Sequence, residues 1–444
     1  MDYPAFDHCM KELCRTARAE NAMEIAHKVC NAIQNTTPAQ FKQEFKPLGG
    51  PPTRLTLAWN VAKALETARK AVKPTEVENA IATIALALLR FPVPWSACTD
   101  NSLDSARENA VSALVRLVEA RACVVSGLPS VVLASASWTT PGDYEPANSQ
   151  VYTFLIPRIL KQLKRGDRVE CSTQLMQCMV QVLQERAATI QNFVMATTIL
   201  RCLRDVMHKL LPMSIVPVKV PPGSRVAFRP ECALKAPPAL KPEQLSAVQA
   251  VGREFLELFS VLLTSPREWT SLFRFDQAVR DFKLAGVFSE VDSARFVSEL
   301  VGVLRAPMAH FSFSRKTAAL KVVPHFLMEG VDIEALETAV RDVAVPQPHP
   351  GPRLGPAAVP IEDRDSDYDS EPDEEDFYLS QEGLILAQKS LTSNSKMVLG
   401  HIAAFKKQKA KAGDTAKAKK DPKVDPKKRG KEAKTGIKKK HKKA

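Results

Sequence analysis

Residues 54–73 read RLTLAWNVAKALETARKAVK, and their apolar side chains recur at helical spacing with the charged side chains away from them. This pattern predicts an amphipathic α-helix. The stripe comprises Leu55, Leu57, Val61, Leu65, Ala68 and Val72. We expect the helix to end at Lys73, because Pro74 disfavours helical geometry in the residue before it. A second helix is then expected from Thr75 to Arg90.

Similar spacing continues over most of the first 345 positions, and strand signals are scarce. The residues Met213 to Val220 are β-branched but carry prolines, so they predict at best an edge strand or an extended connector. The sequence therefore predicts an all-α protein, with a two-lobed multi-helix body that is either a helical bundle or an irregular solenoid. No repeat of fixed period can be aligned. Further helices are expected at about 102–121, 149–165, 168–186, 189–211, 242–264, 274–286, 291–306, 314–329 and 332–344.

Proline and charge divide the chain. Seven prolines occur between Pro217 and Pro242, and six occur between Pro346 and Pro360. Such clusters are typical of linkers and stiff spacers. The predicted order is an N-terminal helical lobe (1–212), a Pro-rich interlobe linker (213–241), a C-terminal helical lobe (242–345), a Pro-rich then acidic disordered linker (346–376), a short amphipathic helical segment (377–405) and a Lys-rich disordered tail (406–444).

Composition excludes several classes of protein. The longest uncharged apolar run, Ala80 to Leu89, is far shorter than the roughly 20 residues needed to span a bilayer. Charged residues interrupt the N-terminal segment, so we expect no signal peptide. Nine cysteines in such a chain indicate a reducing compartment, where cysteine acts as a small buried hydrophobe.

No motif in the chain predicts a reaction. The phosphate-binding patterns GxxxxGK[ST] and GxGxxG are absent from the sequence. His8, Cys9 and Cys14 lie close together, as do Cys171 and Cys178, but neither group has the second close pair that a zinc site requires. We therefore expect no catalytic residues, no cofactor and no metal site, and hence no enzyme.

The C-terminal tail is the most informative feature. Residues 406–444 hold 18 Lys and Arg against four Asp and Glu, with no aromatic residue. Such a segment binds phosphate backbones through counterion release and without sequence preference. Its basic clusters also fit nuclear localisation signals. The candidate nucleic-acid-binding or localisation residues are Lys406, Lys407, Lys409, Lys411, Lys427, Lys428, Arg429, Lys438, Lys439, Lys440, Lys442 and Lys443.

An acidic block precedes the tail. Residues 361–376 hold ten Asp and Glu and one Arg, which is a net charge of −9. This block can compete with nucleic acid for the basic clusters. Ser366 and Ser370 each have an acid three positions on, so they are candidate phosphosites for an acid-directed kinase, and phosphorylation would strengthen the competition. The alternative is a solvated spacer.

The body is itself mildly basic, with a net charge of +7 over residues 1–360. Basic residues gather at two helix ends and in the interlobe linker. If the lobes close around the linker, these side chains would line a groove for a single RNA strand; otherwise they are solvated helix ends. The groove candidates are Arg158, Lys161, Lys164, Arg165, Arg168, Arg201, Arg204, Lys219, Arg225 and Arg229.

Four functions remain open, of which a hydrolase or transferase with an unrecognised site has the least support. The first is a non-enzymatic, RNA-associated helical scaffold or assembly factor in the nucleus, most of all the nucleolus, with RNA favoured over DNA and protein partners on the helical body. The second is a viral nucleoprotein or coat protein that polymerises along RNA in a virion or the host cytoplasm. The third is a protein-binding adaptor whose tail only localises it. None of these functions involves a membrane.

Overall fold

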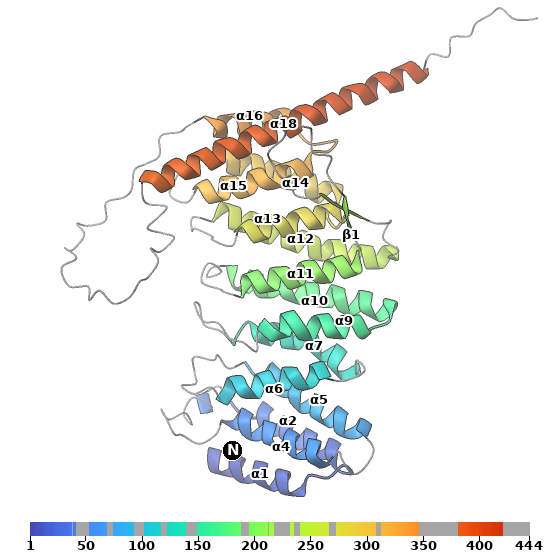
Figure 1. Ribbon diagram of the computed structural model, residues 1–444, viewed down its shortest axis with the longest axis vertical. Helices are drawn as coiled ribbons and strands as arrows, with labels where there is room; N and C mark the ends of the chain where they lie inside the picture. The colour runs from blue at the N-terminus through green and yellow to red at the C-terminus, as the bar shows by residue number, and fades with distance from the viewer. Residues whose placement is uncertain are drawn as a thin grey trace, which may run out of the picture.

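The computed structural model is a stack of helices in two layers, with the N-terminus at one end and a long C-terminal helix across the other (Figure 1). The structure describes residues 1–37, 39–40, 53–68, 74–92, 102–116, 122–138, 149–187, 195–211, 213–216, 231–234, 240–265, 272–307, 312–345 and 381–420.

Layer A is formed by the helices that lie on the front of Figure 1. Each member packs against the next one along the chain within this layer. The members are α1 (Tyr3–Thr16), α4 (Arg54–Ala68), α6 (Ser102–Arg116), the π-helix η2 (Val151–Leu155) with α9 (Ile156–Gln162), α11 (Ala196–Leu210), α13 (Leu272–Leu284) and α15 (Ser312–Val322).

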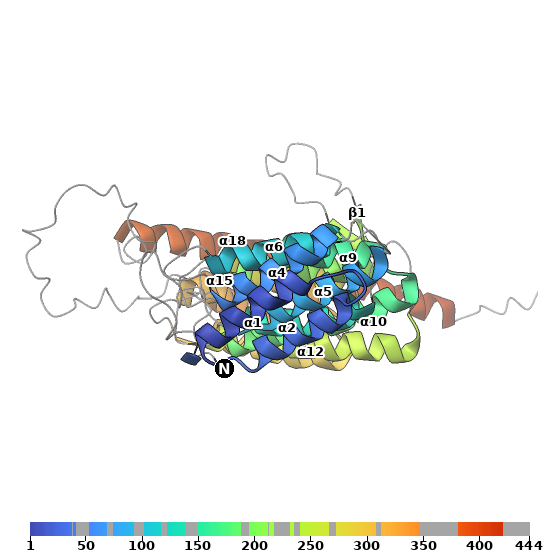
Figure 2. The same cartoon turned by 90° about the horizontal axis from the view of Figure 1, so that it is seen from below.

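Layer B is formed by the alternate helices, which stack in the same way. Seen from the end of the stack, α4, α6 and α9 lie on one side and α10 and α12 on the other (Figure 2). The members of layer B are α2 (Ala22–Gln34), α5 (Pro74–Arg90), α7 (Ala122–Ser135), α10 (Arg165–Glu185), α12 (Pro242–Thr264), α14 (Glu290–Arg305) and α16 (Ile333–Ala344). The apolar stripes of both layers meet between them, so the predicted all-α class is confirmed in its irregular-solenoid form.

The hydrophobic core runs without a break through the solenoid. Buried apolar side chains from Phe6 to Ile402 form one connected cluster. Helices on opposite sides of the expected interlobe linker touch directly, α10 with α12 and α11 with α13. Both predicted lobes therefore contribute to a single core.

The expected linker contains a small antiparallel sheet. Strand β1 (Met213–Val216) pairs with β2 (Glu231–Leu234), with Met213 opposite Leu234. The predicted edge strand at 213–220 is thus present over its first four residues, whereas β2 was not predicted. Residues 217–230 and 235–239 lie outside the described part of the chain.

Most predicted helices are found within a few residues of their expected bounds, but α1, α2 and α7 were not singled out from the sequence. Helix α7 has no charged residue and holds a glycine and a proline, so it shows no amphipathic period. It packs against α5 and α10. A Cβ atom at Gly127 would lie 2.5 Å from Arg90 Nη2 and 3.0 Å from Leu86, so glycine permits the close approach of α7 to α5.

Polar side chains and glycines set several helix ends. Ser289 Oγ accepts from the Asp292 backbone N–H at 3.1 Å at the start of α14, and Asp332 Oδ1 accepts from the Ala335 N–H at 2.9 Å at the start of α16. Each bond satisfies a donor that the helix itself leaves free. Gly286, with a φ of 72°, reverses the chain after α13.

Helix α18 (Gln381–Lys420) closes the C-terminal end of the solenoid. It packs on α15, α16 and the 3₁₀ helix η4 (Val323–Phe326). Leu391, Val398 and Ile402 are each at most 1% exposed in this contact. A terminal cap of this kind covers the apolar surface that the last repeat of a solenoid leaves open.

The expected amphipathic segment 377–405 thus lies largely in α18, but the helix does not end at residue 405. Residues 406–420, expected as part of a disordered tail, continue it to Lys420. Lysine, alanine and glutamine are good helix formers, and no proline occurs before Pro422. Residues 346–376 and 421–444 lie outside the described part of the chain.

We expect the apolar contacts of α18 to contribute strongly to stability. Ile402→Ala should lower the free energy of unfolding by about 2–4 kcal/mol, because it opens a cavity against α15 and α16. Met397→Ala on the same helix is the matched control: Met397 is 46% exposed, so the change should stay within about 0.5 kcal/mol. Urea unfolding of both variants measures the difference, and equal effects would show that α18 does not cap the core.

Candidate nucleic-acid interface

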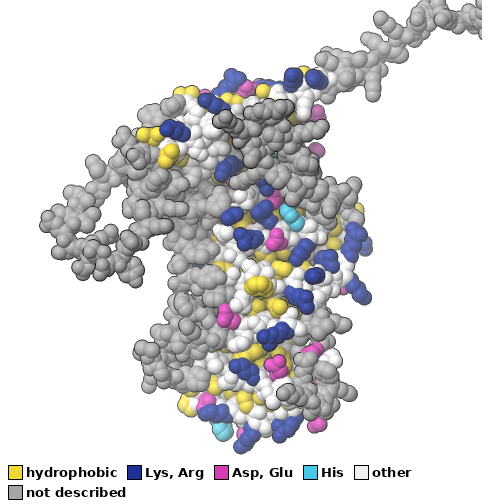
Figure 3. Space-filling model, in the orientation of Figure 1, with side chains coloured by type: hydrophobic (Ala, Val, Ile, Leu, Met, Phe, Trp, Pro, Cys, Tyr) yellow, Lys and Arg dark blue, Asp and Glu magenta, His cyan; other side chains and the backbone are white. Residues whose placement is uncertain are grey.

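The two layers of the solenoid carry opposite charge in its C-terminal half. In layer A, the helices η2, α9, α11, α13 and α15 together hold 11 Lys and Arg against three Asp and Glu. In layer B, α10, α12, α14 and α16 hold six Lys and Arg against 12 Asp and Glu. Figure 3 shows the layer A side, where Lys and Arg side chains occupy successive levels of the stack. The net charge of the C-terminal half is therefore positive in layer A and negative in layer B.

Four basic side chains on neighbouring helices form what we call the basic face: Arg158 and Lys161 on α9, and Arg201 and Lys209 on α11. All four are exposed. Lys209 Nζ lies 3.5 Å from the Pro157 carbonyl oxygen, which places the end of α11 beside the start of α9. Within the described residues, no ion pair uses these four side chains. Their charges are therefore available to an external anion.

The other groove candidates fall into three places. Lys164, Arg165 and Arg168 lie at the turn between α9 and α10, where Arg168 Nη2 donates to the Leu163 carbonyl at 2.7 Å. Arg204 lies on α11. Lys219, Arg225 and Arg229 lie outside the described residues. Helix α11 packs directly on α13. The side of α11 that carries Arg201 and Arg204 is therefore continuous with α13 in layer A.

Arg204 differs from Arg201 in its partners. Its Nε and Nη2 lie 2.7 and 2.5 Å from Asp281 Oδ2 on α13, and its Nη1 donates to Gln277 at 3.2 Å. Arg280 and His208 also approach the Asp281 carboxylate, at 2.9 and 3.5 Å. The Asp281 side chain is fully buried. Arg204 therefore joins α11 to α13 and contributes its charge to the face only in part.

The Asp281 carboxylate is ionised because of these partners. Burial by itself raises the pKa of this group, but the nearby His208 and the charges of Arg204 and Arg280 outweigh it and lower the pKa to about 2. Two guanidinium groups around one carboxylate leave an excess positive charge at this level of the stack. The cluster thus continues the basic face onto α13.

Sequence reasoning missed the contribution of α13 and α15. Arg274, Arg280 and Lys321 follow the basic face upward in layer A, with Lys321 Nζ lying 3.6 Å from the buried Asp276. These residues are far from Arg158 and Arg201 in the sequence. The signal that would have found them is the net charge of alternate helices, since alternate helices of a two-layer solenoid share a face.

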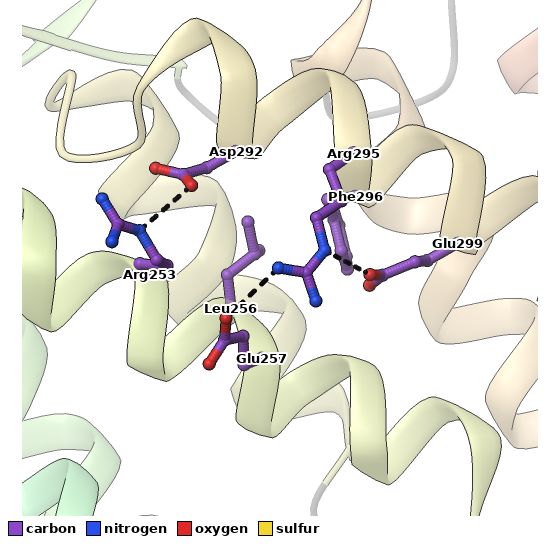
Figure 4. A pocket seen from close by; sticks show the side chains of 7 residues that line it. All are labelled: Arg253, Leu256, Glu257, Asp292, Arg295, Phe296 and Glu299. Atoms are coloured by element: carbon purple, nitrogen blue, oxygen red, sulfur yellow. Dashed lines mark hydrogen bonds and ion pairs between the residues drawn. The ribbon is translucent and has the colours of Figure 1, made fainter.

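Layer B has a contrasting surface between α12 and α14 (Figure 4). Arg253 pairs with Asp292 at 3.2 Å, and Arg295 pairs with Glu257 at 3.3 Å and Glu299 at 3.1 Å. A shallow depression with Leu256 and Phe296 at its base lies among them. Here two arginines pair with three acids, so the network joins two helices and contributes little stability at such exposed positions.

The basic tail begins on α18. Lys406 Nζ lies 2.6 Å from Glu337 and 3.1 Å from Glu334 on α16, so it anchors the helix to the body. Lys407, Lys409 and Lys411 are exposed on the following turns. Lys427, Lys428, Arg429, Lys438, Lys439, Lys440, Lys442 and Lys443 lie outside the described residues, as do Ser366 and Ser370.

The cysteines and histidines of the described residues do not form a metal-binding cluster. No group of three or more metal-ligating side chains occurs in this part of the chain. Cys171 and Cys202 are buried, and burial raises the pKa of the Cys171 thiol to about 11, which disfavours the reactive thiolate. No helix in the described ranges is long and apolar enough to cross a membrane.

Comparison with known proteins adds no relative: no family model, no curated protein and no solved structure matches this chain.

Removal of the Asp281 carboxylate tests the cluster that joins α11 to α13. Asp281→Asn should lower the free energy of unfolding by about 2–4 kcal/mol at pH 7, because two arginines lose their buried partner. The lowered pKa of Asp281 stabilises the folded state above pH 4, and this contribution disappears as the pH falls toward 2. The difference in free energy of unfolding between the variant and the wild type should therefore shrink as the pH falls from 4 to 2. Urea unfolding at each pH measures it.

Asp205→Asn is the matched control for this experiment. Asp205 is an exposed acid on α11, so its loss should change stability by less than about 0.5 kcal/mol. Equal effects of the two substitutions at pH 7 would contradict the structural role of Asp281.

Proposed function

We propose that this protein is a non-enzymatic, RNA-associated helical scaffold that acts in the assembly of ribonucleoprotein in the nucleus and nucleolus. The observation that carries the proposal is the separation of charge between the layers, with the basic face exposed on one side of a rigid wall. The tail supplies a second, sequence-independent contact with phosphate.

The chemistry of the basic face supports a polyanion as its ligand. Four unpaired cations on two adjacent helices, followed by the Arg204, Arg280 and Asp281 cluster on the next level, form a continuous positive strip. Neutralisation of phosphates by such a strip releases condensed counterions, and this release supplies most of the sequence-independent affinity. A rigid helical wall keeps the spacing of these charges fixed.

The position of the tail supports the same proposal. Helix α18 contacts α15, the last member of layer A, and Lys406 fixes it to α16. The exposed lysines that follow leave the body at the C-terminal end of the stack (Figure 1). The tail can therefore follow a nucleic acid beyond the solenoid while the body holds it at the basic face.

Layer B favours protein partners within such a scaffold. Its C-terminal helices have an excess of acids, which repels phosphate and attracts basic proteins. Extended solenoid surfaces commonly serve this role. A protein-binding adaptor without RNA contact would use the same layer, and it differs from our proposal in requiring no RNA affinity from the folded body.

Charge reversal on the basic face tests RNA binding by the body. Arg158→Glu with Arg201→Glu should weaken binding of an unstructured RNA at least 10-fold at 150 mM salt, because two phosphate contacts become repulsions. The slope of log K against log salt should fall by about 1–2. Titration of labelled RNA at several salt concentrations measures both, for residues 1–444 and for residues 1–420, which keep α18 complete.

Lys28→Glu with Arg305→Glu is the matched control, since it makes the same change in net charge on layer B. We expect it to alter affinity less than threefold. If the two double variants bind alike, or if residues 1–420 do not bind RNA at all, the body is no RNA scaffold and the adaptor function takes its place.

Deletion of residues 421–444 tests the localisation. This segment holds 11 Lys and Arg against three Asp and Glu, and its clusters fit import signals and nucleolar retention. We expect the nucleolar signal of a fluorescent fusion to be lost on deletion and to persist in the Arg158→Glu, Arg201→Glu variant. Unchanged nucleolar accumulation of the deletion variant would contradict this part of the proposal.

A further inference from the structure

One strongly exposed aromatic side chain projects from layer A. Phe154 is 61% exposed, and it is the one aromatic among the strongly exposed large hydrophobic side chains of the described residues. Its neighbours behave differently: Tyr152 and Leu155 are buried, and the Tyr152 hydroxyl lies 2.7 Å from Ser135 Oγ. The helix therefore buries its inner side without using Phe154, so the packing of the core does not account for this residue.

Phe154 lies in the π-helix η2, whose wider turn is completed by the Ile156 N–H donating to the Val151 carbonyl. Turns of this kind are rare and occur often at functional sites. The adjoining α9 continues the same helical path with its exposed residues on the side of Phe154.

Positive charge borders Phe154 on two sides. Arg158 and Lys161 are four and seven residues on, which places them on the same side of the helix. Lys209 of α11 has its Nζ 3.5 Å from the carbonyl of Pro157, within one turn of Phe154. Asp205 on α11 is the one acid of η2, α9 and α11. An exposed ring bordered by cations is complementary to a ligand that carries both a negative charge and a flat apolar surface.

We propose that Phe154 is a stacking platform for an unpaired base of single-stranded RNA, with Arg158, Lys161 and Lys209 holding the phosphates on either side. This proposal rests on the proposed function and names its ligand class. Bases of a duplex are stacked and cannot reach the ring, whereas every base of a single strand presents a face to it. Stacking adds affinity without sequence preference, in agreement with a lysine-rich tail that reads no bases.

The test uses the full-length protein and three probes: a 12-nucleotide oligo(U) RNA, an abasic ribose-phosphate 12-mer with the same charge, and a 12-base-pair RNA duplex. Phe154→Ala should weaken oligo(U) binding about 5- to 150-fold, which corresponds to the loss of one stacked base. Binding of the abasic 12-mer and of the duplex should change less than twofold. Phe154→Trp should retain oligo(U) binding and add tryptophan fluorescence. Oligo(U) should quench this fluorescence, whereas the abasic 12-mer and the duplex should not.

Val291→Ala, at a 78% exposed position on layer B, is the control and should leave all three affinities unchanged. If Phe154→Ala binds oligo(U) as the wild type does, or weakens the abasic probe equally, the stacking platform is wrong although RNA binding stands. If the wild-type protein binds neither oligo(U) nor the abasic probe, the proposed function fails together with it.

Discussion

The need of each amphipathic helix to bury one apolar stripe governs the rest of this structure. None of the body helices exceeds 23 residues in the described ranges, and helices of such length gain most of their stability from packing rather than from propensity. Stacking in two layers buries every stripe but leaves an apolar surface at each end. Helix α18 covers one of these ends with Leu391, Val398 and Ile402, so the position of the basic tail follows from the closure of the core.

The same constraint creates the charged faces. Alternate helices enter opposite layers, so the charges of α9, α11, α13 and α15 gather on one side and those of α10, α12, α14 and α16 on the other. Burial between neighbouring helices then decides which charges remain free. Arg204 joins Asp281 inside the wall, while Arg201, one turn earlier, faces solvent. A phosphate backbone would therefore meet the whole charge of Arg201 and only part of that of Arg204.

The proposed platform at Phe154 combines with these features. Its ring supplies a contact with a base, the basic face supplies contacts with phosphates, and the tail extends the reach of the protein. Because η2, α9 and α11 are fixed in one core, the ring and the cations are preorganised. The conformational entropy lost on binding at this site is therefore that of the ligand and not that of the protein.

Sequence by itself determined the helical class, the bounds of most helices and the extreme charges near the C-terminus, because helical periodicity and local composition are properties of contiguous residues. The solenoid period stayed hidden: layer B helices from α5 onward begin at residues 74, 122, 165, 242, 290 and 333, and the unequal connections between them obscure the repeat. Helix α7 escaped prediction because it has no charged residue and shows no clear amphipathic period. Only the tertiary structure placed Asp281 against Arg204 and Lys209 against the Pro157 carbonyl. Contacts between residues about 50 to 80 positions apart depend on how the helices stack and not on any local pattern.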